Sequence, residues 1–246
     1  MIQDISLLSL ALSNPPTLSP SHPPPLPPSP MLLALDTATQ YASIALFDGD
    51  SALAELNWRS QRRHTVELAP QVEALLALAG VKSADLSALA VAIGPGSYTG
   101  TRIALSFAKG VVAATQLPLL GIPTLDAIAL PHRHPQQPLC ALVAAGRKRY
   151  CWASYAPGSG ELQRTSAWGL ATLPDLLPQL TPPMRFAGEL NAADRRWLRS
   201  QWGEGAEIIP PALSIRRAGV LAHLAWPRFQ AGDFDDPALL SPIYLG

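Results

Sequence analysis

The first stretch whose residue types suit chemistry is VAIGPGSYTGTR, residues 91–102, which follows an apolar run. Its glycines permit positive φ angles and close backbone approach, and its hydroxyl residues can cap a following helix, whose exposed N–H groups favour an anion. A Walker phosphate loop requires a lysine after its last glycine, and this segment has none. Two hypotheses stay open, a phosphate loop and a structural joint between strand and helix. The candidate loop residues are Gly94, Gly96, Ser97, Thr99, Gly100 and Arg102.

A second candidate is Asp36, which ends an apolar run and is followed by Thr37-Ala38-Thr39. The same layout occurs in the first phosphate loop of actin-like ATPases, where the aspartate acts through a metal-bound water. This turn lacks the glycine that would let a phosphate approach closely. We therefore favour the interpretation that Asp36 and Thr37 satisfy backbone groups of the turn. On this basis we assign no catalytic, cofactor-binding or metal-binding residue.

The remaining polar clusters carry weaker signals. His132 and His134 lie in a proline-rich loop without an acidic or sulfur partner nearby, which disfavours a metal site. The run 147–149, Arg-Lys-Arg, is expected at a turn between two strands, either as a solvated hairpin tip or as a contact for phosphate or an acidic partner surface. The chain contains neither a GxSxG nor an HExxH motif, and Ser97 has no identifiable His–Asp pair for a protease.

Composition narrows the function classes. Lys and Arg number 18 and Asp and Glu number 18, so no net charge attracts nucleic acid, and independent tRNA or DNA binding is disfavoured. Cys140 and Cys151 show no metal spacing and are expected to be reduced thiols of a cytoplasmic protein. The apolar segment 5–12 is short for a membrane span and lacks a basic region before it, so neither a membrane anchor nor a secretory signal is expected.

The elements that must position these residues follow from periodicity. Three strands are predicted between residues 32 and 58, then a helix that ends at Gly80, a buried strand, a helix over 99–114, a further strand and a short helix. Nine prolines between Pro15 and Pro30 predict that residues 1–30 are a disordered extension or precede a true start at Met31. We expect an α/β protein of two related lobes, 31–130 and 139–246, joined by a linker over 131–138.

Four segments, MLLALDTAT, HTVELAP, AIGPGSYTGTRIALSFAKG and GIPTLDAIA, resemble the TsaB (YeaZ) family, in order and at natural spacing over residues 31 to about 130. The resemblance implies a two-lobed actin/Hsp70-like (ASKHA, ribonuclease H-like) fold. It also implies a non-catalytic subunit, without a cofactor of its own, in the formation of N6-threonylcarbamoyladenosine at position 37 of tRNAs that read ANN codons. The implied partners are TsaD, which carries the chemistry, and TsaE; the family also self-associates when alone, and tRNA is bound only within the complex.

The resemblance further implies that pairing uses two helices, here 65–79 and 99–114. Their apolar and small side chains suit half of a helix bundle that a partner completes, although the same side chains could instead face their own sheet. The predicted interface residues are Leu68, Val72, Leu75, Leu76, Ile103, Ala104, Phe107, Ala108 and Val111. The alternative function, from a different class, is an ATP-binding actin-like phosphotransferase with Asp36 in the metal shell.

Three features depart from the family pattern. The acidic DAR-x-G-E motif is replaced by AAGRKR, residues 144–149, so any role of that motif is not carried over. The terminal arginine of the family is Gly246 here, and residues 1–30 have no counterpart.

Overall fold

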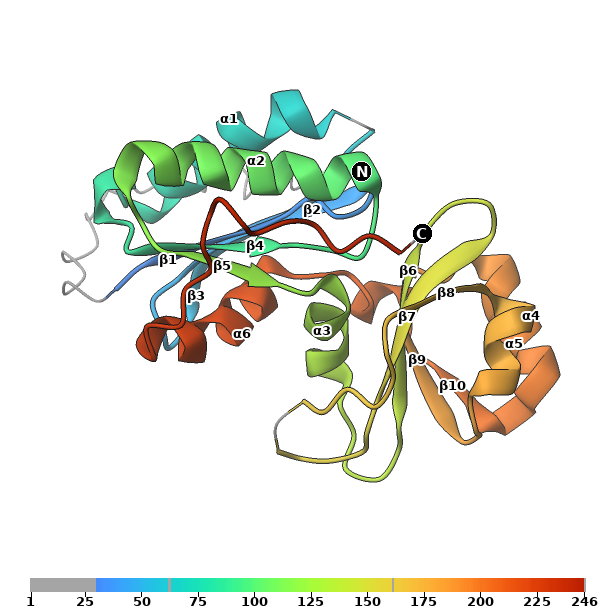
Figure 1. The fold of residues 1–246 in the computed structure, drawn as a ribbon. Helices are drawn as coiled ribbons and strands as arrows, with labels where there is room; N and C mark the ends of the chain where they lie inside the picture. The colour runs from blue at the N-terminus through green and yellow to red at the C-terminus, as the bar shows by residue number, and fades with distance from the viewer. Residues whose placement is uncertain (1–29, 62, 161, 246) are drawn as a thin grey trace, which may run out of the picture.

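The fold contains two five-stranded sheets that repeat one topology (Figure 1). The coordinates are a computed structural model, which describes residues 30–61, 63–160 and 162–245. The prediction of a disordered extension over residues 1–30 lies outside the described residues except for Pro30, and so does Gly246. The expectation of an α/β fold with two related lobes is confirmed by the two sheets.

The first sheet has the strand order β3-β2-β1-β4-β5, in which the first three strands are antiparallel and β1, β4 and β5 are parallel. Its hairpins form because apolar residues fill β1 and β2 while a turn at Gly49, with a φ of 99°, reverses the chain. The strands are β1 (Leu32–Asp36), β2 (Tyr41–Phe47), β3 (Ala52–Arg59), β4 (Ala88–Ala92) and β5 (Leu119–Ile122).

The second sheet has the order β8-β7-β6-β9-β10, again three antiparallel strands followed by two parallel ones. The strands are β6 (Leu139–Ala144), β7 (Arg149–Tyr155), β8 (Gly169–Thr172), β9 (Met184–Gly188) and β10 (Ala206–Ile208). The helices α4 (Leu173–Leu176) and α5 (Ala192–Trp202) cover one face of this sheet. The two lobes therefore share one plan of strand order and direction.

Two long helices lie side by side on one face of the first sheet, as Figure 1 shows. They are α1 (His64–Ala79) and α2 (Tyr98–Thr115). The predicted end of the first helix is confirmed, because Gly80 takes a left-handed conformation with a φ of 67°. The second helix begins one residue earlier than expected, since Ser97 is its N-cap and accepts a hydrogen bond from the Gly100 N–H.

The lobe boundaries in space differ from the predicted ranges 31–130 and 139–246. The short helix α3 (Thr124–Ala129) packs against β6, β7 and β9 of the second sheet. The C-terminal helix α6 (Ala218–Gln230) instead covers the free face of the first sheet, below the strands in Figure 1. The physical reason is that each sheet has two apolar faces, and the helix that covers the second face comes from the other half of the chain.

The segment after α6 also returns to the first sheet. Asp235 donates from its N–H to the Leu119 carbonyl and accepts from the Gly121 N–H through its carboxylate, at 2.9 and 2.7 Å. Further along, the Ile243 N–H donates to the Ile93 carbonyl at 2.7 Å. Residues 218–243 thus pack with the first lobe, and the second lobe is formed by residues 139–217 together with α3 from the first half of the chain.

Candidate partner interface and inter-lobe cleft

The glycine-rich loop between β4 and α2 packs directly on the turn that follows β1. The Ser97 N–H donates to the Ala38 carbonyl at 2.6 Å, and the Thr37 hydroxyl donates to the Gly100 carbonyl at 2.6 Å. A Cβ atom at Gly96 would lie 2.4 Å from the Ala38 oxygen, and one at Gly100 would lie 2.2 Å from the Thr37 oxygen. These glycines are required because two backbone segments touch there. The geometry supports a structural joint and leaves no space for a phosphate between loop and turn.

The exposed end of this loop contacts the C-terminal segment. Arg102 lies over the Tyr98 ring, with its guanidinium carbon 3.8 Å from the ring centroid, and its Nε donates to the Tyr244 hydroxyl. Hydrogen bonding to Tyr244 raises the pKa of Arg102 above its ordinary value. Thr99 is exposed on the first turn of α2, and Gly94 has a φ of 91°. The six predicted loop residues thus lie together between β4, the first turns of α2 and the C-terminal segment, with Thr99 exposed.

Asp36, the candidate metal-shell acid, is engaged by an arginine from the other end of the chain. The Arg216 Nε donates to the Asp36 carboxylate at 2.7 Å, while the Ala38 N–H donates to the same carboxylate at 2.7 Å. Arg216 also donates to Glu189 at 2.8 Å and to the Tyr41 carbonyl at 2.7 Å. Arg216 and Asp36 side chains are each 2% exposed. We call Arg216, Asp36 and Glu189 the buried charge triad.

The buried charge triad joins both lobes. Asp36 ends β1 in the first lobe, Glu189 follows β9 in the second, and Arg216 precedes α6. Burial alone would lower the pKa of Arg216, but the two carboxylates beside it raise that pKa above its ordinary value. Sequence reasoning missed Arg216 and Glu189, because partners separated by 180 residues leave no local pattern. The described residues contain no cluster of three or more His, Cys, Asp or Glu side chains that could hold a metal ion.

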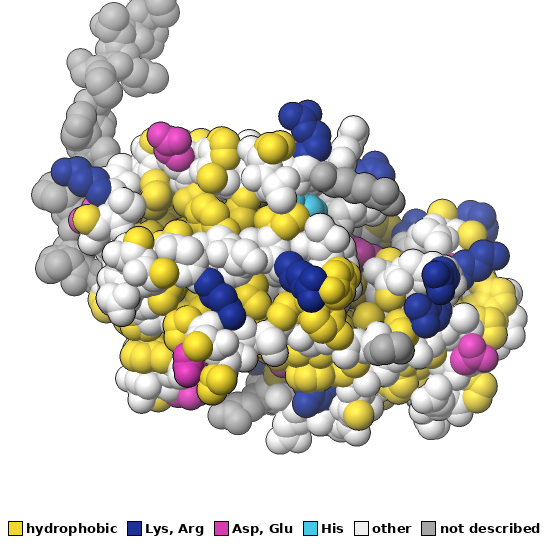
Figure 2. Space-filling view, turned by 45° about the horizontal axis from the view of Figure 1, so that its top comes forward, with side chains coloured by type: hydrophobic (Ala, Val, Ile, Leu, Met, Phe, Trp, Pro, Cys, Tyr) yellow, Lys and Arg dark blue, Asp and Glu magenta, His cyan; other side chains and the backbone are white. Residues whose placement is uncertain are grey.

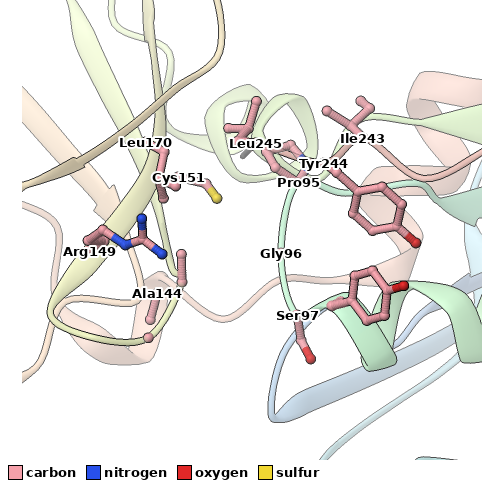
Figure 3. A pocket seen from close by; sticks show the side chains of 13 residues that line it. Pro95, Gly96, Ser97, Ala144, Arg149, Cys151, Leu170, Ile243, Tyr244 and Leu245 are labelled. Atoms are coloured by element: carbon pink, nitrogen blue, oxygen red, sulfur yellow. The ribbon is translucent and has the colours of Figure 1, made fainter.

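A cavity of about 630 Å³ lies between the lobes (Figure 3). On one side it is lined by the loop from Pro95 to Tyr98, and on the other by the β6–β7 turn with Arg149. Figure 3 shows the Arg149 side chain extending from β7 toward the side that carries Gly96 and Ser97. The Nε atom of Arg149 is buried and has no hydrogen-bond partner among the described residues.

The predicted partner face on α1 and α2 is only partly available. Five of its residues are buried in the core of their own lobe, against the first sheet: Leu68, Val72, Leu75, Ala104 and Ala108. Helical spacing identifies an apolar face without showing which surface covers it, so the sequence does not separate these core residues from those that face outward. The other four are only partly buried at the margin of the core: Leu76, Ile103, Phe107 and Val111.

A groove of about 450 Å³ runs between the two helices, visible as a hydrophobic furrow in Figure 2. Ala69 from α1 and Ile103 and Phe107 from α2 line it. Elsewhere on α1, Val66 is 59% exposed and Leu78 is 81% exposed, although neither lines the groove. Apolar side chains on adjacent helices with no cover from their own chain are characteristic of a protein–protein contact.

The sequence and the fold of this chain are similar to those of several known proteins. A family model described as TsaD, tRNA N6-adenosine threonylcarbamoyltransferase, matches residues 58–184, slightly more than half of the chain. The tRNA threonylcarbamoyladenosine biosynthesis protein TsaB of Escherichia coli is 38% identical over 98 residues, which are 40% of this chain and 42% of that protein. TsaB of Bacillus subtilis is 29% identical over 196 residues, or 78% of this chain and 86% of that protein. The solved structure of YeaZ from Pseudomonas aeruginosa covers 88% of this chain and 100% of its own, with a TM-score of 0.72 and 25% identity.

The chain belongs to the family that this model describes, and within it to the TsaB (YeaZ) members. The match spans less than half of the E. coli protein, so the activity and partners of the relatives are not transferred by similarity alone. An activator of 2-hydroxyisocaproyl-CoA dehydratase from Clostridium difficile, solved with bound ADPNP, has a TM-score of 0.50 at 9% identity over 84% of this chain and 98% of its own. That likeness supports the two-lobed actin-like fold, which is the predicted fold class. No helix among the described residues is long and apolar enough to cross a membrane.

Proposed function

We propose that this chain is a non-catalytic subunit in the formation of N6-threonylcarbamoyladenosine at position 37 of ANN-decoding tRNAs. It pairs with the catalytic subunit TsaD through α1 and α2, TsaE joins the pair, and tRNA binds to the assembled complex in the cytoplasm. In the absence of TsaD, two copies of the chain pair through the same face.

The observation that carries this proposal is the apolar groove between α1 and α2, which the chain itself leaves uncovered. Ile103 and Phe107 line it on α2, and Ala69 lines it on α1. A helical pair from a partner would complete a bundle on this surface, with side chains of both pairs interdigitating.

The non-catalytic role is supported by the buried charge triad and by the loop joint. In the alternative phosphotransferase, Asp36 would face a metal-bound water, but here its carboxylate is paired with Arg216 and the Ala38 N–H. The loop before α2 is packed on Thr37 and Ala38 and does not form an open phosphate cradle. Asp36 and the loop before α2, the two candidates for nucleotide binding, are thus both engaged in contacts within the chain.

The test is reconstitution with TsaD and TsaE from the same genome, an ANN-decoding tRNA transcript and a supplied activated donor of the threonylcarbamoyl group. Modified adenosine, measured by mass spectrometry of digested tRNA, is expected only when this chain is present. Equal modification without the chain would refute the proposal.

The pairing face is tested by one substitution in the groove and one matched control. Ala69→Arg places a long charged side chain on an exposed residue of the groove without opening the core, and it should abolish co-purification with TsaD. Ala193→Arg makes the same change on the exposed surface of α5 in the other lobe, and it should leave pairing intact. Equal recovery of TsaD with both variants would rule out the groove as the pairing face.

A further inference from the structure

The β6–β7 turn holds two basic residues in a backbone conformation that suits them poorly. Arg147 and Lys148 have φ angles of 51° and 59°, and the Arg149 N–H donates to the Gly146 carbonyl at 2.9 Å across them. Positive φ at both central residues is the requirement of a type I′ hairpin turn, for which Asn-Gly is the favoured pair. Long side chains are strained there, and such strain concentrates at functional sites.

The turn lies at the mouth of the inter-lobe cleft, between two hollows. Arg149 lines the cavity that faces the loop before α2. On the other side, Gly146 lines a second hollow of about 570 Å³ together with Arg59 from β3. Figure 2 shows Lys and Arg side chains gathered on the part of the second lobe that borders the first. Cations from both lobes therefore border the cleft.

These cations are available to a ligand. Among the described residues, none of Arg59, Arg147, Lys148 and Arg149 forms an ion pair with a carboxylate. Arg59 donates instead to the Gln40 side chain, and Arg147 and Lys148 are exposed. The acid in the second hollow, Glu189, already accepts from Arg216 and from the Thr39 hydroxyl.

The arrangement fits a chain of phosphates. Exposed Lys and Arg side chains that lie on two sides of a cleft can contact successive phosphates, and such contacts position a nucleic acid without reading its sequence. The centre of a protein–protein interface is by contrast apolar and depleted in lysine. With equal numbers of acidic and basic residues, the chain lacks the overall charge to bind RNA strongly alone, so the contact adds to binding by a complex.

We propose that the turn Gly146–Arg149 contacts the sugar–phosphate backbone of the RNA substrate in the assembled complex; this inference rests on the proposed function. Arg147 and Lys148 supply the phosphate contacts, and Arg149 extends the basic surface into the cleft.

The test uses a substitution that removes the charges and improves the turn. Arg147→Asn together with Lys148→Gly installs the pair that this turn prefers, so the variant should unfold at the same or a higher temperature than the wild type. The control, Arg196→Gln with Arg199→Gln, removes the same charge from exposed positions on α5.

Binding of a fluorescein-labelled ANN-decoding tRNA transcript to the reconstituted complex is followed by fluorescence anisotropy between 50 and 200 mM salt. Loss of two phosphate contacts reduces the slope of log affinity against log salt by about 1.8. The wild type should then lose about 12-fold more affinity than the turn variant over this range, while the control follows the wild type.

A turn variant with the wild-type slope would overturn the inference, even if tRNA modification still required the chain and the proposed function stood. Loss of complex assembly in the turn variant, seen by size-exclusion chromatography, would also overturn it and assign the turn to an acidic protein surface. If modification proves independent of the chain, the proposed function fails; a reduced slope in the same titrations would still support an RNA contact.

Discussion

Replacement of Arg216 by methionine should destabilise the protein severely. Methionine has a similar length and no charge, so the variant leaves the Asp36 and Glu189 carboxylates without their cation. The Asp36 side chain is 2% exposed and that of Glu189 is 13% exposed, so water compensates little. Removal of one partner from a buried ion pair costs about 3–5 kcal/mol, mainly because the other charge is stranded. We expect a loss of about 4 kcal/mol in the free energy of unfolding.

The assay is urea denaturation followed by tryptophan fluorescence, with thermal unfolding as a second measure. A loss of this size should lower the melting temperature by about 6–20 °C in a protein of this length. Arg216→Lys keeps the charge, but one ammonium nitrogen cannot replace three guanidinium nitrogens that reach three acceptors. It should cost about 1–3 kcal/mol.

The adjacent arginine provides the control. Arg217 pairs with Glu55, and its own side chain is 61% exposed while that of Glu55 is 9% exposed. Glu55 keeps a hydrogen bond from the Gly219 N–H when Arg217 is removed, so we expect a smaller loss than at Arg216. If Arg216→Met destabilises the protein no more than Arg217→Met does, the buried charge triad does not hold the lobes together. Recovery of stability in the variant that also carries Asp36→Asn and Glu189→Gln would show that the stranded charges cause the loss.

Three further predictions concern other residues. Gly100→Ala should destabilise the protein by about 2 kcal/mol or more, because the new Cβ would lie 2.2 Å from the Thr37 oxygen. Gly110→Ala lies in open space on the same helix and should stabilise the protein by about 0.5–1 kcal/mol. Equal urea midpoints for the two variants would contradict the close packing of the loop. Burial raises the pKa of Asp126, so its ionisation should reduce the stability of the protein as the pH rises from about 4 through that raised pKa. The Asp126→Asn variant should therefore gain stability relative to the wild type between pH 4 and pH 7. A constant difference in urea midpoint between the two proteins would contradict this. Burial raises the pKa of Cys151 to about 11, so a thiol reagent at pH 8 should modify it only after guanidinium is added, and modification of the native protein within minutes would be inconsistent with a buried thiol.

Local signals in the sequence predicted the elements well. The end of α1 at Gly80 depends on residues within one helical turn, so their types are sufficient, while the start of α2 was predicted to within one residue. The succession of three strands, helix, strand, helix, strand and short helix in the first half of the chain also agrees with the structure. These features are encoded by neighbours along the chain.

Features set by distant residues were not predicted. The periodicity of α1 and α2 identified an apolar stripe, but only the structure separates buried Val72 and Ala108 from the half-exposed Phe107. No local pattern in the sequence shows that α3 packs on the second sheet and α6 on the first. The apolar residues of each helix would be the same whichever sheet the helix covered. The same holds for Arg216, whose neighbour Arg217 has the same residue type and lies on the surface.

The position of α6 has a consequence for how the chain folds. The face of the first sheet that α6 covers is built from strands within the first half of the sequence, yet its cover is formed by residues 218–230. During synthesis that apolar face remains open until residues 218–230 have left the ribosome. A fragment that contains only the first sheet with α1 and α2 should aggregate, and adding α6 as a separate peptide should restore a compact lobe.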